Sequence, residues 1–188
     1  MKRFQNTWNW LALCLATTFF VGFAPGKVRG KPGSMGGTAG AFVALTAQIW
    51  LIGYQGWFIP SVITIASFLV GILVIGTAER FLFLTTGPRM RHTGEMVISD
   101  FNETCIDEFH GQFLAGLPVW LMAGTQGTKV VALLVSFLVF RIVDSQKPWP
   151  VNAVEKHFSG TSFGIMIDDT VAALPACAAT AAILKIAS

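Results

Sequence analysis

Six long apolar runs constrain the fold of this chain more strongly than any other feature of its sequence. Several approach the roughly 20 residues that a helix needs to cross a membrane, and a soluble domain of 188 residues has no use for so many. We therefore expect an all-α fold, a membrane-embedded helical bundle of about four to six helices that forms one domain over residues 1–188. The runs cover residues 8–25, 38–54, 57–78, 113–123, 130–140 and 170–187, with Lys185 as their only charged residue.

The N-terminal run and the composition narrow the class of protein. Lys2 and Arg3 precede an apolar stretch, as in a secretory signal, but no clean cleavage site follows it. Residues 8–23 are therefore expected to form the first membrane helix, with a signal peptide as the alternative. The three cysteines are scattered, which favours neither a disulfide framework nor a zinc cluster. A net charge of +3 without a basic, aromatic-rich stripe gives no support for nucleic-acid binding.

All ten carboxylates lie between Glu79 and Asp169, although the chain is 53% hydrophobic. If the apolar runs cross the membrane in alternation, every acidic motif falls at one membrane face. Most lysines and arginines lie at that face too, so the positive-inside rule predicts that it is cytoplasmic. The segments expected there are residues 25–37, 79–104, 107–110, 141–150 and 160–169.

The first acidic segment predicts a stripe of charge. If residues 97–123 are helical, Asp100, Glu103 and Asp107 fall within about a quarter turn of one another. Glu103 and Asp107 would then repel each other unless a cation lies between them. Gly111 follows one turn after Asp107 and would leave room for a ligand. A solvated helix surface is the alternative interpretation.

The second segment ends an apolar helix with a guanidinium, a carboxylate and an ammonium group. Arg141 and Asp144 can pair at i,i+3, and Lys147 complements the negative end of the helix, which Pro148 and Pro150 terminate. The same three charged groups also offer phosphate ligands and a metal ligand. Both interpretations are compatible with this segment taken alone.

Two further segments have the residues of helix starts. Asp168 or Asp169 is expected to cap the alanine-rich helix that follows, and the second acid is then available for a divalent cation. The glycine-rich residues 31–40 open the second helix, where backbone N–H groups can face an anion. A flexible surface loop is the alternative, and the Gly-Lys-Ser/Thr ending of a Walker A loop is missing.

Other phosphatase chemistries lack their residues in this sequence. A cysteine phosphatase needs an arginine six positions after its cysteine, but those positions hold Phe20, Gly111 and Ile183. The Pro-Ser-Gly-His segment of histidine-dependent lipid phosphatases does not occur. Residues 100–104 resemble an aspartyl-nucleophile loop only faintly, because Asn102 replaces its second acid. Carboxylate and metal chemistry remains.

Five motifs, in this order and spacing, resemble a known family. They are Pro32-Gly33-Ser34-Met35-Gly36, Asp107-Glu108-Phe109 with Gly111, Phe140-Arg141 with Asp144, Lys147-Pro148-Trp149-Pro150, and Gly164-Ile165-Met166-Ile167-Asp168-Asp169 with Val171-Ala172. From about Gly22 to the C-terminus the chain is similar to the phosphatidylglycerophosphatase A family. The resemblance implies an all-helical bacterial inner-membrane enzyme that hydrolyses phosphatidylglycerophosphate to phosphatidylglycerol and phosphate with Mg²⁺. Departures include His110, where an apolar residue is usual, and Ala173, where glycine is usual.

The resemblance and the residues together lead to one hypothesis for the site. Four acids are expected to hold one or two Mg²⁺ ions, and Asp144 is expected to be a further ligand or to orient the attacking water. Arg141 and Lys147 would bind the phosphate of the lipid, and the loop around Gly33 and Ser34 would cradle that phosphate or the glycerol. The four acids are Asp107, Glu108, Asp168 and Asp169.

The remaining acids and two rival functions complete the sequence-based expectations. Glu79, Glu95 and Glu155 are expected to be surface charges. A divalent-cation channel or transporter would also gather acids among membrane helices, but it would place some of them within apolar runs. An enzyme that transfers a phosphoalcohol between lipids would use paired aspartates and Mg²⁺, but its long Asp-rich signature does not occur here.

Overall fold

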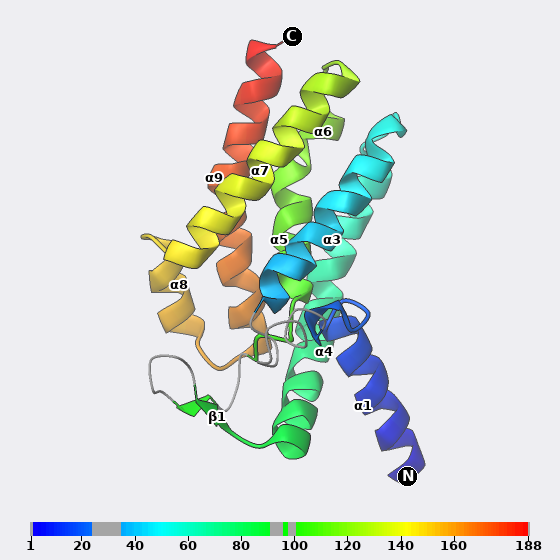
Figure 1. Cartoon of the computed structure of the whole chain (residues 1–188), viewed down its shortest axis with the longest axis vertical. Coiled ribbons are helices and arrows are strands. Elements are labelled where there is room, and N and C mark those ends of the chain that lie inside the picture. Colours follow the sequence, from blue (N-terminus) through cyan, green and yellow to red (C-terminus); the bar gives the residue numbers. More distant parts are fainter. Residues whose placement is uncertain (1, 24–34, 91–95, 98–100, 188) are drawn as a thin grey trace.

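The computed structural model describes residues 2–23, 35–90, 96–97 and 101–187 of the chain (Figure 1). Its α-helices are α1 (Lys2–Ala16), α3 (Gly36–Trp50), α4 (Phe58–Thr86), α5 (Ile106–Gly116), α6 (Pro118–Leu121), α7 (Gln126–Gln146), α8 (Val151–Phe158) and α9 (Ser162–Ile186). Two 3-10 turns, η1 (Val21–Phe23) and η2 (Leu51–Gly53), and a two-residue antiparallel ribbon of β1 (Arg89–Met90) and β2 (Met96–Val97) complete the described elements. The predicted all-α class is confirmed.

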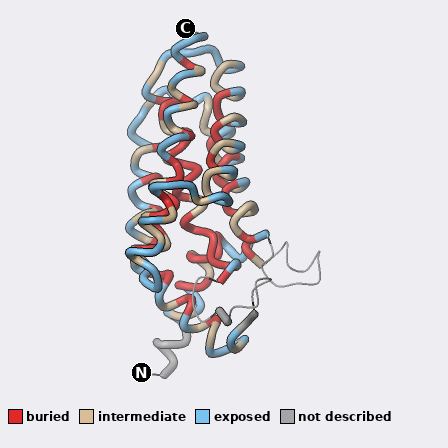
Figure 2. Tube along the Cα trace, turned by 90° about the vertical axis from the view of Figure 1, so that its left-hand side faces the viewer, coloured by how far each residue is buried: buried red, intermediate tan, exposed pale blue. Residues whose placement is uncertain are grey.

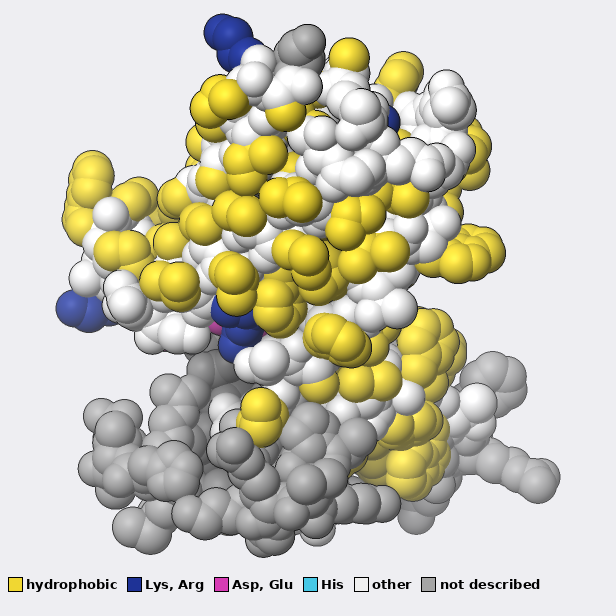
Figure 3. All heavy atoms as spheres, turned by 45° about the horizontal axis from the view of Figure 1, so that its top comes forward, with side chains coloured by type: hydrophobic (Ala, Val, Ile, Leu, Met, Phe, Trp, Pro, Cys, Tyr) yellow, Lys and Arg dark blue, Asp and Glu magenta, His cyan; other side chains and the backbone are white. Residues whose placement is uncertain are grey.

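Four of the described helices are long and apolar enough to cross a membrane. They are α3 together with η2, α4, α7 and α9. Their outer faces remain apolar, as Leu69 and Leu73 on α4 and Leu138 on α7 are exposed. Figure 3 shows hydrophobic side chains over most of the described surface on one side of the molecule. Such surfaces are matched by lipid rather than water, which confirms the predicted membrane bundle.

The first helix lies nearer the N-terminus than predicted. It ends at Ala16 rather than near residue 23, and its 15 residues do not make one of the four candidate spans. The reason is local, because Thr18, Phe19 and Phe20 adopt φ angles of 48°, 58° and 67°, a left-handed conformation that stops a right-handed helix. Helix α1 instead packs along the C-terminal half of α4.

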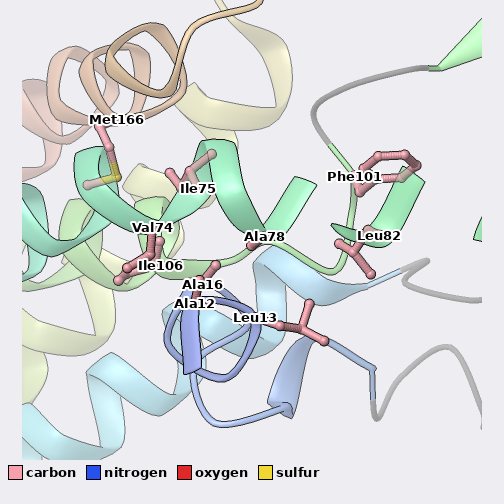
Figure 4. Packing of buried hydrophobic residues seen from close by; sticks show 10 residues of the cluster. All are labelled: Ala12, Leu13, Ala16, Val74, Ile75, Ala78, Leu82, Phe101, Ile106 and Met166. Atoms are coloured by element: carbon pink, nitrogen blue, oxygen red, sulfur yellow. The ribbon is translucent and has the colours of Figure 1, made fainter. Parts of the chain in front are cut away.

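Figure 4 shows this contact between α1 and α4. Ala12 and Ala16 of α1 face Val74 and Ala78 of α4, and Ile106 at the start of α5 closes the cluster. Small residues on both helices let the backbones approach closely. The cluster fixes the C-terminal half of α4 next to the start of α5.

Helix α5 lies in the middle of the bundle, where it packs against α3, α4, α7 and α9 (Figure 1). Figure 2 shows buried residues along the inward sides of these helices and exposed ones outside. The condition for the predicted acidic stripe, one helix over 97–123, is not met, because α5 begins at Ile106 and ends at Gly116, and α6 starts with Pro118 at its first position. Proline has no N–H to donate, so it interrupts the backbone ladder.

A buried polar side chain compensates for this interruption. The Nε2 group of Gln48 on α3 donates to the backbone oxygens of Gln112 and Phe113, each at 3.2 Å. The Gln112 side chain donates in turn to Gln48 Oε1 at 3.0 Å and to Ser136 Oγ on α7 at 3.1 Å. Without water, carbonyl groups at a helix end must find protein donors. The break in α5 therefore ties three helices together.

Candidate active site

Charged residues from three helices, α5, α7 and α9, meet at one end of the bundle. The first turn of α5 contributes Asp107 and Glu108, and the last turns of α7 contribute Arg141 and Asp144. Helix α9 contributes Asp168 and Asp169, and Lys147 is the C-cap of α7. The structure thus brings together all seven charged residues of the sequence hypothesis.

Three of these acids form a tight cluster. Asp107, Glu108 and Asp169 each offer a carboxylate oxygen, and these three oxygens lie within 4.8 Å of one another. Asp107 and Asp169 are buried, and Glu108 is partly buried. Among the described residues, Glu108 Oε2 and Asp169 Oδ2 are buried and have no hydrogen-bond partner. Buried carboxylate oxygens without donors are costly unless a cation compensates them, so the cluster fits a hard divalent ion such as Mg²⁺.

Asp144 and Arg141 flank this cluster. Arg141 Nη1 donates to Asp144 Oδ2 at 2.7 Å, which confirms the predicted i,i+3 pair, and it lies 3.9 Å from Glu108 Oε1. Its Nη2 group donates to Thr38 Oγ1 on α3 at 3.3 Å. Burial, reinforced by the charge of Asp144, raises the pKa of Glu108 to about 7. Placing these acids together therefore makes it harder to ionise Glu108, which is why its pKa is raised.

Lys147 links the end of α7 to α9. Its Nζ donates to Asp168 Oδ2 at 2.8 Å and to Glu155 Oε1 on α8 at 2.6 Å. Burial opposes the charge of Lys147, but Asp168 and Glu155 outweigh it and hold the lysine pKa above its ordinary value. The residue is left-handed (φ 43°, ψ 56°), and its N–H donates to Val143 O. Glu155 was predicted to be a surface charge, but it is only partly exposed and forms an ion pair with Lys147.

Asp168 and Asp169 do not cap α9, contrary to expectation. The helix begins at Ser162, and the hydroxyl of Thr161 accepts the Gly164 N–H as the N-cap. Both aspartates lie inside the helix and are buried. Asp168 Oδ1 accepts the N–H of Asp169 at 3.0 Å. In the sequence, Gly160 followed by Thr161 indicates that the helix starts before Asp168, because glycine suits the turn and threonine is a good N-cap. Gly160 has a φ angle of 77° in the structure.

The predicted acidic stripe is also wrong. Residues 101–105 are not helical, so Glu103 and Asp107 are not at i,i+4 of one helix. Glu103 is fully buried, and Asp100 lies outside the described residues. Glu79, predicted to be a surface charge, is buried and accepts the Phe101 N–H at 3.0 Å. The segment before α5 is therefore an internal connection rather than a charged surface.

Two glycines have packing roles at the site. A side chain on Gly111 would collide with the Phe140 ring, so this glycine permits helix packing and does not leave room for a ligand as predicted. Gly37 in the first turn of α3 lies against Glu108 and Arg141, where a Cβ atom would overlap the Glu108 carboxylate. Gly33 and Ser34, the predicted phosphate cradle, lie outside the described residues, as does Glu95.

A model of the family described as phosphatidylglycerophosphatase A matches residues 14–184. The chain is 27% identical to a phosphatidylglycerophosphatase A of Escherichia coli (strain K12), over 90% of this chain and 79% of that protein. It is 28% identical to a phosphatidylglycerophosphatase A of Haemophilus influenzae, over 82% of this chain and 79% of the relative. No solved structure matches the chain.

Proposed function

Because this chain belongs to the phosphatidylglycerophosphatase A family, we propose that it hydrolyses the phosphomonoester of phosphatidylglycerophosphate with Mg²⁺ held at the acidic cluster. The observation that carries the proposal is the convergence of two buried carboxylates and the partly buried Glu108 with Arg141 and Lys147. Family membership also favours hydrolysis over the cation-channel and phosphoalcohol-transfer alternatives.

The proposed metal ligands are the clustered acids and their immediate neighbours. Asp107, Glu108 and Asp169 supply the oxygens that lie within 4.8 Å of one another. Asp144 and Asp168 interact electrostatically with Asp169 and are the proposed further ligands. A bound Mg²⁺ would neutralise the charge that develops on the transferred phosphoryl group. One acid of the set is proposed to orient the attacking water, with Asp144 as the candidate if it is not a metal ligand.

Arg141 and Lys147 are the proposed phosphate ligands. Arg141 has five N–H donors, so it can keep Asp144 and Thr38 and still bind an oxygen of the phosphate. Lys147 stays protonated because Asp168 and Glu155 hold its charge. Gly33 and Ser34 are proposed to approach the phosphate or the glycerol, because Gly37 and Thr38 in the adjoining turn contact Glu108 and Arg141.

The proposed location is the bacterial inner membrane, with the site at the cytoplasmic face. The placement of most cations near the acidic motifs supports this orientation. A lipid phosphomonoester places its headgroup at such a surface while its chains remain among the apolar helices. A Ser34→Cys variant tests this orientation. We expect a membrane-impermeant thiol reagent to label the variant in sealed inverted vesicles but not in right-side-out ones.

The decisive assay uses the purified full chain in detergent with phosphatidylglycerophosphate in mixed micelles. Phosphate release is expected with Mg²⁺ and is expected to stop in EDTA. Asp107→Asn and Asp168→Asn should abolish release while the proteins keep their thermal unfolding transition. Full release by either variant would refute the proposed site. Release from another phosphomonoester but not from this lipid would preserve the chemistry and reject the substrate.

A further inference from the structure

A recess of about 370 Å³ opens at the end of the bundle opposite the acidic site. Its walls come from the turn between α3 and α4, from the end of α6 and from the start of α7. Lys129 lies about 22 Å from Asp144 along α7, given 1.5 Å per residue, so the recess is separate from the acidic cluster. The lining residues used below are Tyr54, Gln55, Trp120, Ala123 and Lys129.

The recess carries a positive charge, and the described segments around it contain no acidic side chain. Lys129 is partly buried, its stem lies against Gly124, and it has no ion pair among the described residues. The three segments that build this end, residues 51–57, 117–131 and 181–187, contain neither aspartate nor glutamate. A partly buried ammonium group without a carboxylate attracts an anion.

The position of the recess is that of a lipid headgroup. It lies where the α3 span ends and where the α4 and α7 spans begin. Exposed aromatic residues surround this level, because Trp50, Trp57 and Phe58 all have more than half of their surface exposed. Tryptophan and tyrosine concentrate at the boundary between lipid and water. The recess therefore faces headgroups rather than acyl chains or bulk solvent.

We propose that this recess binds the phosphate-bearing headgroup of an anionic phospholipid, at a second site that does not hydrolyse it. The Lys129 ammonium would pair with the phosphate, as basic pockets between membrane helices do. The Tyr54 hydroxyl and the Gln55 amide can hydrogen-bond headgroup hydroxyls. The Trp120 ring forms an apolar wall, since its Nε1 already donates to Leu51 O at 3.3 Å. A volume of this order accommodates a headgroup.

The test measures phosphatidylglycerol binding to the full chain in detergent by native mass spectrometry, with EDTA present. Lys129→Gln should weaken binding at least about fivefold, because a charge-assisted hydrogen bond is lost. Lys185→Gln makes the same charge change at the same end, and it should change binding less than about twofold because that charge is exposed. Equal losses in the two variants would overturn the proposal, since they would indicate non-specific attraction.

Two further variants test the recess without changing charge. Ala123→Trp should fill it and remove binding, and Tyr54→Phe should weaken binding with little effect on folding. Unchanged binding in Ala123→Trp, with a normal unfolding transition, would overturn the proposal. Inorganic phosphate that bound with the same midpoint as the lipid would show a free-anion site and would also overturn it.

A parallel set of measurements distinguishes binding at the recess from binding at the acidic site. Asp107→Asn should leave phosphatidylglycerol binding at the recess unchanged, and loss of binding there would place the lipid at the acidic cluster instead. Lys129→Gln should retain release of phosphate from phosphatidylglycerophosphate. Failure of the phosphatase proposal and failure of the lipid-site proposal therefore give different results.

Discussion

The Nε2 atom of His110 on α5 lies 3.1 Å from the Oγ1 atom of Thr170 on α9. The other ring nitrogen, Nδ1, lies 2.9 Å from the backbone oxygen of Thr64 on α4. Burial lowers the pKa of His110 to about 4, so the ring is neutral near pH 7. Nδ1–H then donates to the carbonyl, and the one hydrogen of the Thr170 hydroxyl is shared between Nε2 and the backbone oxygen of Met166, which lies 2.7 Å from Thr170 Oγ1. Because Glu108 and Asp169 lie within two residues of this pair, the hydrogen bond sets the spacing of the helices that carry the acids.

Replacing both members of this pair tests its role. We expect His110→Phe and Thr170→Val each to lower the free energy of unfolding by about 1 kcal/mol or more, with a coupling energy of about 0.5–1.5 kcal/mol in the double variant. Both should also raise the Mg²⁺ concentration needed for half-maximal phosphate release, since the acids move apart. Denaturant titration in detergent and a metal titration measure the two effects. Strict additivity of the two substitutions would contradict the coupling.

Removing a carboxylate from the acidic cluster is expected to lower phosphate release but not the unfolding temperature of the metal-free protein. Asp169→Asn removes one of three like charges, so without metal it should unfold at the same or a higher temperature than the wild type. Mg²⁺ should raise the wild-type unfolding temperature by a few degrees, roughly as mass action requires, and should not stabilise the variant. Glu155→Gln, a carboxylate outside the cluster, should retain this rise. An equal Mg²⁺ response in Asp169→Asn would contradict the ligand assignment.

The contact of α3 with the site predicts sensitivity at Gly37. In Gly37→Ala the new methyl group overlaps the Glu108 carboxylate and must displace it. Phosphate release should fall more than about tenfold, because small displacements of reacting groups are costly, while the helix itself tolerates alanine. Gly127→Ala is the matched control in the first turn of α7, where the nearest atom to a new Cβ is 3.9 Å away. Comparable loss in the control would indicate a general effect on folding.

Two substitutions at Lys147 separate its backbone role from its side-chain role. Lys147→Gly and Lys147→Ala both remove the ammonium group, and both should reduce phosphate release by roughly a hundredfold. The glycine variant should be about 1 kcal/mol more stable than the alanine variant, because φ is 43° at this C-cap. Thermal unfolding and phosphate-release assays measure these two quantities. Full activity in Lys147→Gly would remove the side chain from the proposed phosphate site.

Local sequence determined the apolar membrane spans and the order of the acidic motifs along the chain. The apolar runs specify membrane helices because backbone hydrogen bonds must be made internally in lipid. Arg141 and Asp144 pair because residues at i,i+3 share one helix face. The acids Asp107, Glu108, Asp168 and Asp169 stand in short motifs whose order is visible without a structure. These features depend on neighbours within one or two turns, so a single sequence contains them.

Tertiary structure decided how those residues face one another. Glu79 and Glu103 are buried, and Glu79 accepts the N–H of Phe101, which follows α4 by a long connection. Glu155 pairs with Lys147 because the chain turns back between α7 and α8. Helix α1 ends at Ala16 because the residues that follow are left-handed, and α5 ends before Pro118. A pattern of apolar residues alone does not show either of these ends. His110 joins α4, α5 and α9 through partners more than 40 residues away. Hydropathy specifies which side of a helix avoids water, whereas the choice of partner depends on packing between helices, which exists only in the folded bundle.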